Sequence, residues 1–327
     1  MIWSKIFYFF KKILPITIGI VLLWWVYHSA NTTEKEQLLH SLENAHLGFV
    51  FLSMGLGILA HFLRALRWQW ALKPLGHQPS VVNLFASLMA GYLSNLGIPR
   101  SGELIRCQFV SKYEQISFSQ VLGSVVMERV LDIIMLLVCC ILAGICHYTL
   151  FIQLVLQFNP MVSVVVVLGM ILLGIIGVLI LNRLQFSFLE KLKTFGNSIL
   201  EGLQSVRKVT SPFWFIVVTV CIWVLYFLMT YSVSWALPEL QTRDLGIYLM
   251  AFLAGTFSMT VTSGGIGILP YPLAVASVLV FFEIENTTAE AFGWLVWTGQ
   301  TLLNCILGAL AFIILPLWNR RRLSMQK

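Results

Sequence analysis

Residues 133–182 read IIMLLVCCILAGICHYTLFIQLVLQFNPMVSVVVVLGMILLGIIGVLILN, a run of fifty positions without an Asp, Glu, Lys or Arg. A helix needs about 20 mostly apolar residues to cross the roughly 30 Å hydrocarbon layer of a bilayer, so this run is long enough for two crossings. Gln153, Gln157, Asn159 and Pro160 predict a turn near its middle. The run therefore predicts an integral membrane protein.

The composition of the whole chain supports the same class. The 327 residues are 58% hydrophobic and 11% charged, whereas a soluble domain carries roughly 25% charged residues. The net charge of +7 comes from basic residues between the apolar runs, so we expect phospholipid head groups, and not nucleic acid, as the anionic partner. The sequence has no spacing typical of zinc or nucleotide sites, and we expect no metal and no cofactor.

Six regions of the chain are apolar enough to enter a membrane: 13–33, 47–63, 74–99, 115–182 apart from one charged cluster, 209–238, and 245–319 apart from an acidic patch. They predict an all-α fold, a polytopic integral membrane helical bundle with about six to eight crossings. We expect residues 1–327 to form a single membrane domain. Two regions are interrupted by helix-breaking residues, and we predict re-entrant or broken helices near 81–106 and 246–282.

The placement of Lys and Arg predicts an orientation, because basic loops stay cytoplasmic. If residues 74–99 and 245–282 each dip into the membrane and return, 18 of the 21 Lys and Arg residues, Arg64 and Arg67 among them, lie inside. We therefore expect a multi-pass protein of the bacterial inner membrane with both termini cytoplasmic. In the alternative, residues 74–99 make a full crossing, which needs an extra short helix near 117–132.

The first polar cluster lies in the stretch NLGIPRSGELIR, residues 95–106. Pro99 stops a helix and disfavours helical geometry at Ile98. Ser101 is a suitable N-cap for a new helix that begins after it. The stretch therefore predicts a helix that breaks and restarts.

Arg100 and Arg106 flank the start of this second helix. A helix N-terminus presents backbone N–H groups and a positive dipole end, and together with two guanidinium groups it suits a phosphate. In the alternative, the cluster is a charged loop at the membrane surface, and Glu103 and Arg106 form a local i, i+3 ion pair.

The second polar cluster is the stretch ERVLD, which lies between two apolar segments. On one helix Glu128 and Asp132 share a face at i, i+4, and Arg129 reaches Asp132 at i, i+3. Charges inside a membrane cost several kcal/mol unless they pair or line a wet cavity. One interpretation is a structural triad, in which the carboxylates or Glu103 hold Arg129. The other, which we favour because Glu128 and Asp132 outnumber Arg129, is a polar cavity for a lipid head group or a proton-coupled carboxylate.

The third cluster is TVTSGGIG, residues 260–267, whose glycines interrupt an apolar run almost at its centre. Gly264, Gly265 and Gly267 permit positive φ angles and a close approach of the backbone to a ligand. Broken helices in transporters expose backbone dipoles in this way near the bilayer midplane. A tight turn between two short helices explains the same pattern.

Together, the three clusters resemble the membrane domain of the lysylphosphatidylglycerol synthase family, also described as flippase-like membrane proteins. The resemblance covers roughly residues 10–318. It rests on the stretch from Gly97 to Arg106, the stretch from Glu128 to Asp132, and the glycine turn, in this order and separation. It implies an all-helical domain that moves lipids with large polar heads between leaflets.

The chain departs from the family pattern at the glycine turn. The family often has a proline before the glycine pair and an acidic residue three positions after the last glycine, where this chain has Ser263 and Pro270. The missing carboxylate argues against a cationic lysyl head group. The soluble aminoacyltransferase domain of two-domain members is also absent from this sequence.

The sequence thus favours a translocase for a lipid with a phosphate-containing polar head group. We expect substrate contacts from Arg100, Glu103, Arg106, Glu128, Arg129 and Asp132, and helix breaks at Pro99, Gly264, Gly265 and Gly267. No Walker motif, zinc-protease motif or nucleophile elbow occurs, so we do not expect an enzyme. Two alternatives remain: an intramembrane enzyme acting on a phospholipid or polyprenyl-phosphate head group, and a non-catalytic partner of a lipid-modifying enzyme. The sequence is also compatible with a homo-oligomer.

Overall fold

The structure, a computed structural model, describes residues 45–98, 100–146, 148, 209, 211–261 and 270–320. All regular secondary structure in these ranges is helical. Several predicted features lie outside the described residues: the first crossing at 13–33, residues 149–182 of the 133–182 run, and the breaks at Pro99, Gly264, Gly265 and Gly267.

Four helices in the described part are long and apolar enough to cross a membrane. They are α3 (Leu47–Leu72), α6 (Phe118–Cys146), α10 (Pro212–Ser234) and α13 (Asn286–Trp318). Short 3₁₀ turns follow α3 at Lys73–Leu75 and α10 at Pro238–Leu240. The prediction of an all-α polytopic membrane bundle is confirmed.

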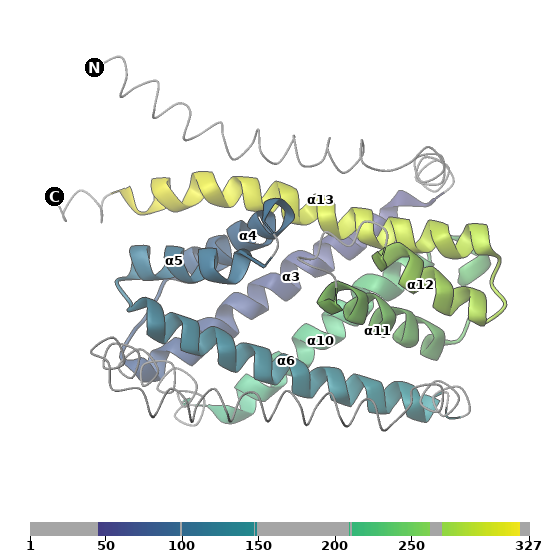
Figure 1. The fold of residues 1–327 in the computed structure, drawn as a ribbon, viewed down its shortest axis with the longest axis horizontal. Coiled ribbons are helices and arrows are strands. Elements are labelled where there is room, and N and C mark those ends of the chain that lie inside the picture. The colour runs from purple at the N-terminus through teal and green to yellow at the C-terminus, as the bar shows by residue number, and fades with distance from the viewer. Residues whose placement is uncertain are drawn as a thin grey trace, which may run out of the picture.

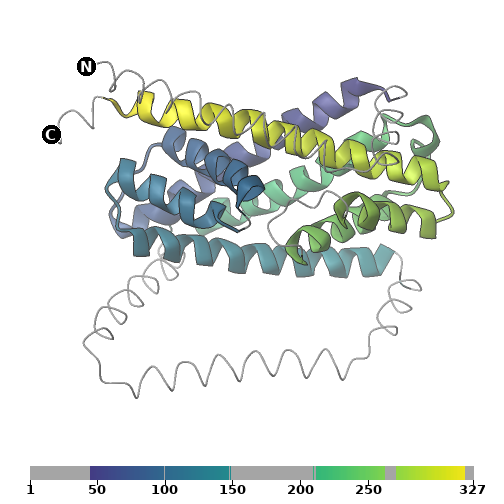
Figure 2. The same ribbon diagram turned by 45° about the horizontal axis from the view of Figure 1, so that its top comes forward.

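Four shorter helices form two hairpins. One consists of α4 (Val81–Gly97) and α5 (Gly102–Glu114), the other of α11 (Leu245–Val261) and α12 (Pro270–Phe281). At 1.5 Å per residue the longest of them spans only about 25 Å, less than the hydrocarbon thickness. The hairpins occupy opposite ends of the bundle, and the α4–α5 tip and the inner ends of α11 and α12 point toward its middle (Figures 1 and 2).

The first hairpin decides between the two predicted topologies. α4 enters the bundle and α5 returns to the same end, so residues 74–99 dip in and come back (Figure 1). The alternative of a full crossing is wrong, because the extra helix that it needs near 117–132 does not exist. α6 runs through that segment without a break.

The tip of the first hairpin is shaped by its backbone. Ile98 is extended, with φ −127° and ψ 111°, which is the geometry that a following proline favours. Arg100 has a φ of 61°, in the left-handed region. Ser101 takes the N-cap position of α5 as predicted, but its hydroxyl does not cap the helix and donates instead to the Ser94 carbonyl at 3.1 Å.

The two helices of this hairpin touch through glycines near the tip. The Asn95 side chain accepts a hydrogen bond of 2.7 Å from the N–H of Gly102, and so caps α5 from the neighbouring helix. A Cβ atom on Gly102 would overlap the carbonyl oxygen of Gly91, and one on Gly91 would lie 2.7 Å from the carbonyl oxygen of Gly102. Only glycine allows this approach.

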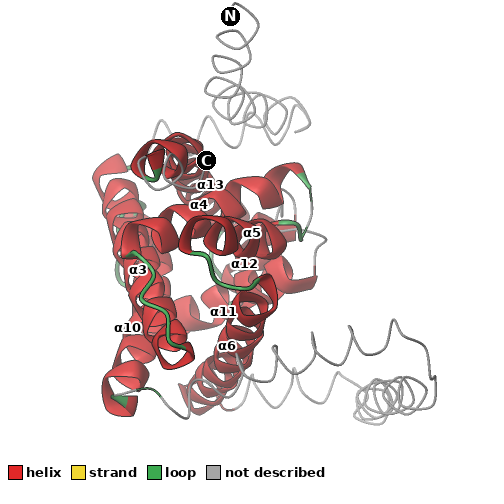
Figure 3. Cartoon of the chain, turned by 90° about the vertical axis from the view of Figure 1, so that its left-hand side faces the viewer, coloured by secondary structure: helices red, strands yellow, loops and turns green. Residues whose placement is uncertain are grey.

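Helix α13 packs against both hairpins. A Cβ on Gly308 would lie 2.5 Å from the Cβ of Leu93 on α4, and one on Gly293 would lie 2.5 Å from the carbonyl oxygen of Pro272 on α12. Viewed along the long axis, α13 and α6 lie on opposite sides of the two hairpins (Figure 3). Helix α13 therefore contacts α4 of the first hairpin and α12 of the second.

We predict that Gly102→Ala destabilises the protein by about 1–3 kcal/mol, because the added methyl overpacks the α4–α5 contact. The melting temperature of the detergent-solubilised chain should fall. Gly55→Ala is the matched control, since a Cβ there meets nothing within 4 Å. A Gly102→Ala protein as stable as the control would contradict the packing described for the hairpin.

Candidate functional site

A buried carboxylate lies at the centre of an arginine network. Glu128 on α6 is 3% exposed. Its carboxylate forms ion pairs with Arg64 of α3, with Arg67 of α3 at 3.5 Å, and with Arg106 of α5 at 3.0 Å. Arg129, the next residue on α6, approaches it at 3.5 Å. Because a lone charge in a membrane interior is costly, these arginines stabilise Glu128 as the anion.

Asp132 extends the network one helical turn further along α6. It pairs with Arg67 at 3.3 Å, with Arg129 at 3.3 Å and with Arg64 at 3.7 Å. Glu128 and Asp132 therefore share one face of a single helix, as their i, i+4 spacing predicts.

Uncharged side chains on two further helices complete the network. Arg64 donates hydrogen bonds to the hydroxyls of Tyr92 on α4 and Tyr226 on α10, the latter at 3.3 Å. Arg67 donates to the Thr219 hydroxyl on α10 at 3.4 Å. The network thus connects α3, α4, α5, α6 and α10.

Glu103 and Arg106 of α5 take part in different contacts. Glu103 pairs with Arg129 at 3.2 Å, and the two side chains are 46% and 42% exposed. Arg106 turns to the buried side, where its guanidinium lies 5.0 Å from the ring centre of Trp68. The alternative, a local ion pair between Glu103 and Arg106, does not form, because both residues find partners on α6 instead.

The charge balance of the interior differs from the prediction, in which carboxylates outnumber Arg129. The structure brings together five arginines and three carboxylates: Arg64, Arg67, Arg100, Arg106, Arg129, Glu103, Glu128 and Asp132. Among the described residues, no group of His, Cys, Asp and Glu side chains could hold a metal ion. The surplus of positive charge is suited to an anionic ligand.

Sequence reasoning missed Arg64 and Arg67, which it counted among cytoplasmic charges. Both are buried in α3, which continues the apolar stretch 47–63 by nine residues to Leu72. Their i, i+3 spacing, followed directly by Trp68 and other apolar residues, was a usable signal. It indicates two cations on one face of a continuing helix.

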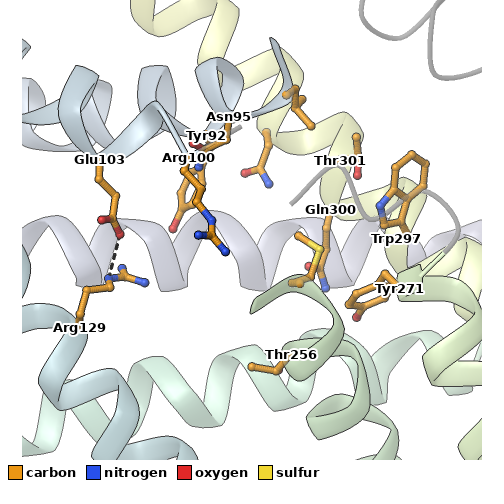
Figure 4. A pocket seen from close by; sticks show the side chains of 13 residues that line it. Tyr92, Asn95, Arg100, Glu103, Arg129, Thr256, Tyr271, Trp297, Gln300 and Thr301 are labelled. Atoms are coloured by element: carbon orange, nitrogen blue, oxygen red, sulfur yellow. Dashed lines mark ion pairs between the residues drawn. The ribbon is translucent and has the colours of Figure 1, made fainter. Parts of the chain in front are cut away.

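A cavity of about 580 Å³ lies between the α4–α5 tip and the described ends of α11 and α12. Its walls come from α4, α5, α6, α11, α12 and α13. Arg100 points into the space that Arg129 borders on one side and Gln300 on the other (Figure 4). Among the residues that the structure describes, no carboxylate lies within ion-pair distance of Arg100. We call this space the polar chamber.

A second space of about 480 Å³ adjoins it, and we call this the apolar chamber. Both chambers share walls at Tyr92, Arg129, Thr256 and Asn304, among others. Most of the exposed wall area of the apolar chamber is apolar, and its hydrophobic side chains include Ile133, Leu136, Trp223, Met229, Phe252, Met259 and Leu303. His61, Arg64, Arg129 and Asp132 also line it. The two chambers together form an amphipathic cavity inside the membrane bundle.

One face of α13 supplies uncharged polar groups that sequence reasoning also missed. Trp297, Gln300, Thr301 and Asn304 follow the i, i+3, i+4, i+7 pattern of one helix face, and all four line the polar chamber. The buried Trp297 indole N–H and the Asn304 side-chain oxygen have no hydrogen-bond partner among the described residues. The polar stripe on an otherwise apolar helix was the signal that could have found them.

The six predicted contact residues fall into two groups. Arg100, Glu103 and Arg129 line the polar chamber, and Arg129 and Asp132 line the apolar chamber. Arg106 and Glu128 are instead buried in the arginine network. Their predicted contact with a lipid stays a prediction, and in this structure they position their neighbours.

We predict that Glu128→Gln destabilises the protein by about 3–5 kcal/mol, because it leaves buried arginines without their carboxylate. Glu103→Gln, which breaks the exposed pair with Arg129, should cost only about 0–1 kcal/mol. Thermal unfolding of both variants in the same detergent measures the difference. Equal losses would show that the buried network does not stabilise the fold.

Comparisons with known proteins agree with a membrane protein of this kind. The family model described as "Lysylphosphatidylglycerol synthase TM region" matches residues 12–309. The chain is 24% identical over 317 residues to UPF0104 membrane protein MJ1595 of Methanocaldococcus jannaschii, covering 86% of this chain and 88% of the relative. It is 29% identical over 141 residues to UPF0104 membrane protein PH1989 of Pyrococcus horikoshii, covering 41% and 40%. No solved structure matches this chain.

The family match includes both hairpins, the arginine network and the residues of α13 that line the cavity. It also agrees with the resemblance of the three polar clusters in the sequence to the same family. The chain therefore belongs to the family of lysylphosphatidylglycerol synthase transmembrane regions.

Proposed function

We propose that this protein translocates a lipid with a polar, phosphate-containing head group between the leaflets of the membrane. The observation that carries the proposal is the amphipathic cavity between the inner ends of two opposed hairpins, with a surplus of arginines over carboxylates. A phosphate contributes the negative charge that this surplus favours. The family name, which refers to a lysylated phospholipid synthase, supports a lipid-related role.

The chamber walls suggest how the lipid is held. The phosphate lies against Arg100, whose guanidinium is not neutralised by a described carboxylate, and next to Arg129. The apolar chamber accommodates hydrocarbon beside the head group. The cavity thus gives the head group a polar environment where the bilayer alone would offer hydrocarbon, which is the main barrier to spontaneous movement.

The hairpins support access from both sides. Each is short, and each enters from a different end of the bundle, so the polar chamber lies between the inner ends of their helices and not at one surface (Figure 1). Displacement of one hairpin at a time would open the chamber to one leaflet at a time. The sequence has no Walker motif, and we propose that movement is passive, ion-coupled or driven by consumption of the product.

We further propose that the protein lies in the plasma membrane, in a bacterium the inner membrane, with both termini in the cytoplasm. The bundle end that carries the first hairpin's loops has Lys73, Lys112 and Arg320. The opposite end carries mainly acidic residues: Glu239, Asp244, Glu283, Glu285 and Glu290. Positive residues favour the cytoplasmic side.

Translocation is testable in liposomes that contain the purified protein and an acyl-labelled phosphatidylglycerol, with dithionite quenching the outer leaflet. The wild type should accelerate loss of the protected fluorescence. Arg100→Gln should slow it by about tenfold or more, because a charge-assisted hydrogen bond contributes about 1.5–3 kcal/mol. Arg243→Gln, on an exposed loop between α10 and α11, is the matched control and should behave as the wild type.

Equal rates for Arg100→Gln and Arg243→Gln would contradict the assigned path. The same liposomes distinguish a translocase from the enzyme alternative, because lipids extracted after the assay keep their mass if they are only moved. A product of changed mass would replace this proposal with the intramembrane enzyme.

The orientation predicts opposite accessibility at the two ends of the bundle. Lys112→Cys should react with an impermeant maleimide only from the cytoplasmic side, and Glu239→Cys only from the outer side. A background with Cys146 and Cys221 replaced by Ser is the control, because both native thiols are exposed in the bundle. Labelling of both new cysteines from one side would refute the hairpin topology as well as the orientation.

A further inference from the structure

The walls of the polar chamber also favour a particular kind of substituent on the phosphate. Given the proposed function, the chemical groups of the walls decide which head group the chamber can satisfy. At about 580 Å³, the chamber lies within the range of roughly 300–1,000 Å³ that is common for small-molecule sites. It therefore has room for a phosphate and a substituent.

The carboxylates of the cavity are already neutralised. Glu103 pairs with Arg129 at 3.2 Å. Asp132 pairs with Arg64, Arg67 and Arg129 within 3.7 Å. An ammonium group would have to displace an arginine to reach either carboxylate, and it would meet the repulsion of the remaining guanidinium groups. The cavity is unfavourable for a head group that carries an amine.

The uncharged wall offers donors and acceptors together. Trp297, which is 5% exposed, has an indole N–H without a partner, and this N–H can only donate. The unpartnered side-chain oxygen of Asn304 can only accept. In Figure 4 the indole nitrogen lies on the side of the ring that faces Gln300, so the Trp297 donor faces into the chamber.

A hydroxyl satisfies both kinds of group, because it donates and accepts. An ammonium only donates, and a phosphate diester only accepts. Gln300 and Thr301 on the same face of α13, and Asn95 on α4, add further uncharged polar groups to the wall. The rings of Trp297 and Tyr271 supply apolar surface for carbon atoms between hydroxyls. These groups match a polyol.

We propose that the substrate is an anionic lipid whose phosphate carries an uncharged, hydroxyl-rich substituent such as glycerol or a sugar, and not an amine. The phosphate lies at Arg100, and the hydroxyls lie against Trp297, Gln300 and Asn304. Arg100 sets the affinity for all phosphodiester lipids, whereas the α13 face sets the preference among substituents.

Binding to the purified full-length chain in detergent tests this assignment. The probes are three dioctanoyl lipids with the same tails and phosphodiester: phosphatidylglycerol, phosphatidylethanol and phosphatidylethanolamine. Phosphatidylglycerol should bind about tenfold more tightly than phosphatidylethanol, since it satisfies buried groups that ethanol leaves unpaired. Phosphatidylethanolamine should bind more weakly than both. Binding of phosphatidylethanolamine as tight as that of phosphatidylglycerol would overturn the proposal.

Variants separate the two parts of the site. Gln300→Met combined with Asn304→Leu should remove the preference for phosphatidylglycerol over phosphatidylethanol, because it weakens binding of phosphatidylglycerol about tenfold more than binding of phosphatidylethanol. Arg100→Gln should weaken both lipids by the same factor. Gln108→Met, on the exposed side of α5, is the matched control. Equal weakening of both lipids by the α13 double variant would refute the role of that face.

A soluble probe distinguishes a lipid from a free phosphate. Glycerol 3-phosphate should not displace phosphatidylglycerol at a similar concentration, because it lacks the hydrocarbon that the apolar chamber accommodates. Displacement at a similar concentration would overturn the assignment to a lipid.

The binding assay and the liposome assay together distinguish a wrong head-group assignment from a wrong proposed function. Selective binding of phosphatidylglycerol without movement in liposomes would refute translocation and leave the head-group assignment standing. Equally fast movement of phosphatidylglycerol and phosphatidylethanolamine with equal affinities would refute the assignment and leave translocation standing.

Discussion

The ion pairs of Glu128 constrain the rest of this structure. A carboxylate that is 3% exposed inside a membrane bundle requires cations close by, and Arg64, Arg67 and Arg106 supply them from α3 and α5. Meeting that requirement fixes the rotation of α6 and the depth of the first hairpin. The tip that carries Arg100 is thereby placed at the middle of the bundle and not at its surface.

Helix α13 provides the second constraint, because it contacts both hairpins. Its glycines at 293 and 308 allow close approach of α12 and α4, and the residues between them include the polar stripe. The cavity follows from this arrangement: the hairpin helices are too short to meet across the bundle, and the space between their inner ends is bordered by α13 on one side and α6 on another.

The chemistry of the cavity follows from the balance of its charges. Each described carboxylate of the interior is engaged by at least one arginine, while Arg100 faces the chamber. The family to which the chain belongs is described by a lysylated phospholipid, yet the walls here combine positive charge with amides and hydroxyls. If the proposed function holds, differences in these wall residues offer a physical route by which one membrane fold can bind different head groups.

The sequence by itself determined the membrane class, the helical content, the broken hairpins and the shared face of Glu128 and Asp132, because these depend on hydrophobic length, helix-breaking residues and spacing within one helix. Only the tertiary structure decided which charges meet. Arg64 and Arg67 lie more than sixty positions from Glu128 along the chain, and Glu103 prefers Arg129 on α6 to Arg106 on its own helix. The polar stripe of α13 was visible in the sequence, but its role depended on which helices it faces. Contacts between distant segments are set by packing, and local sequence patterns do not encode their partners.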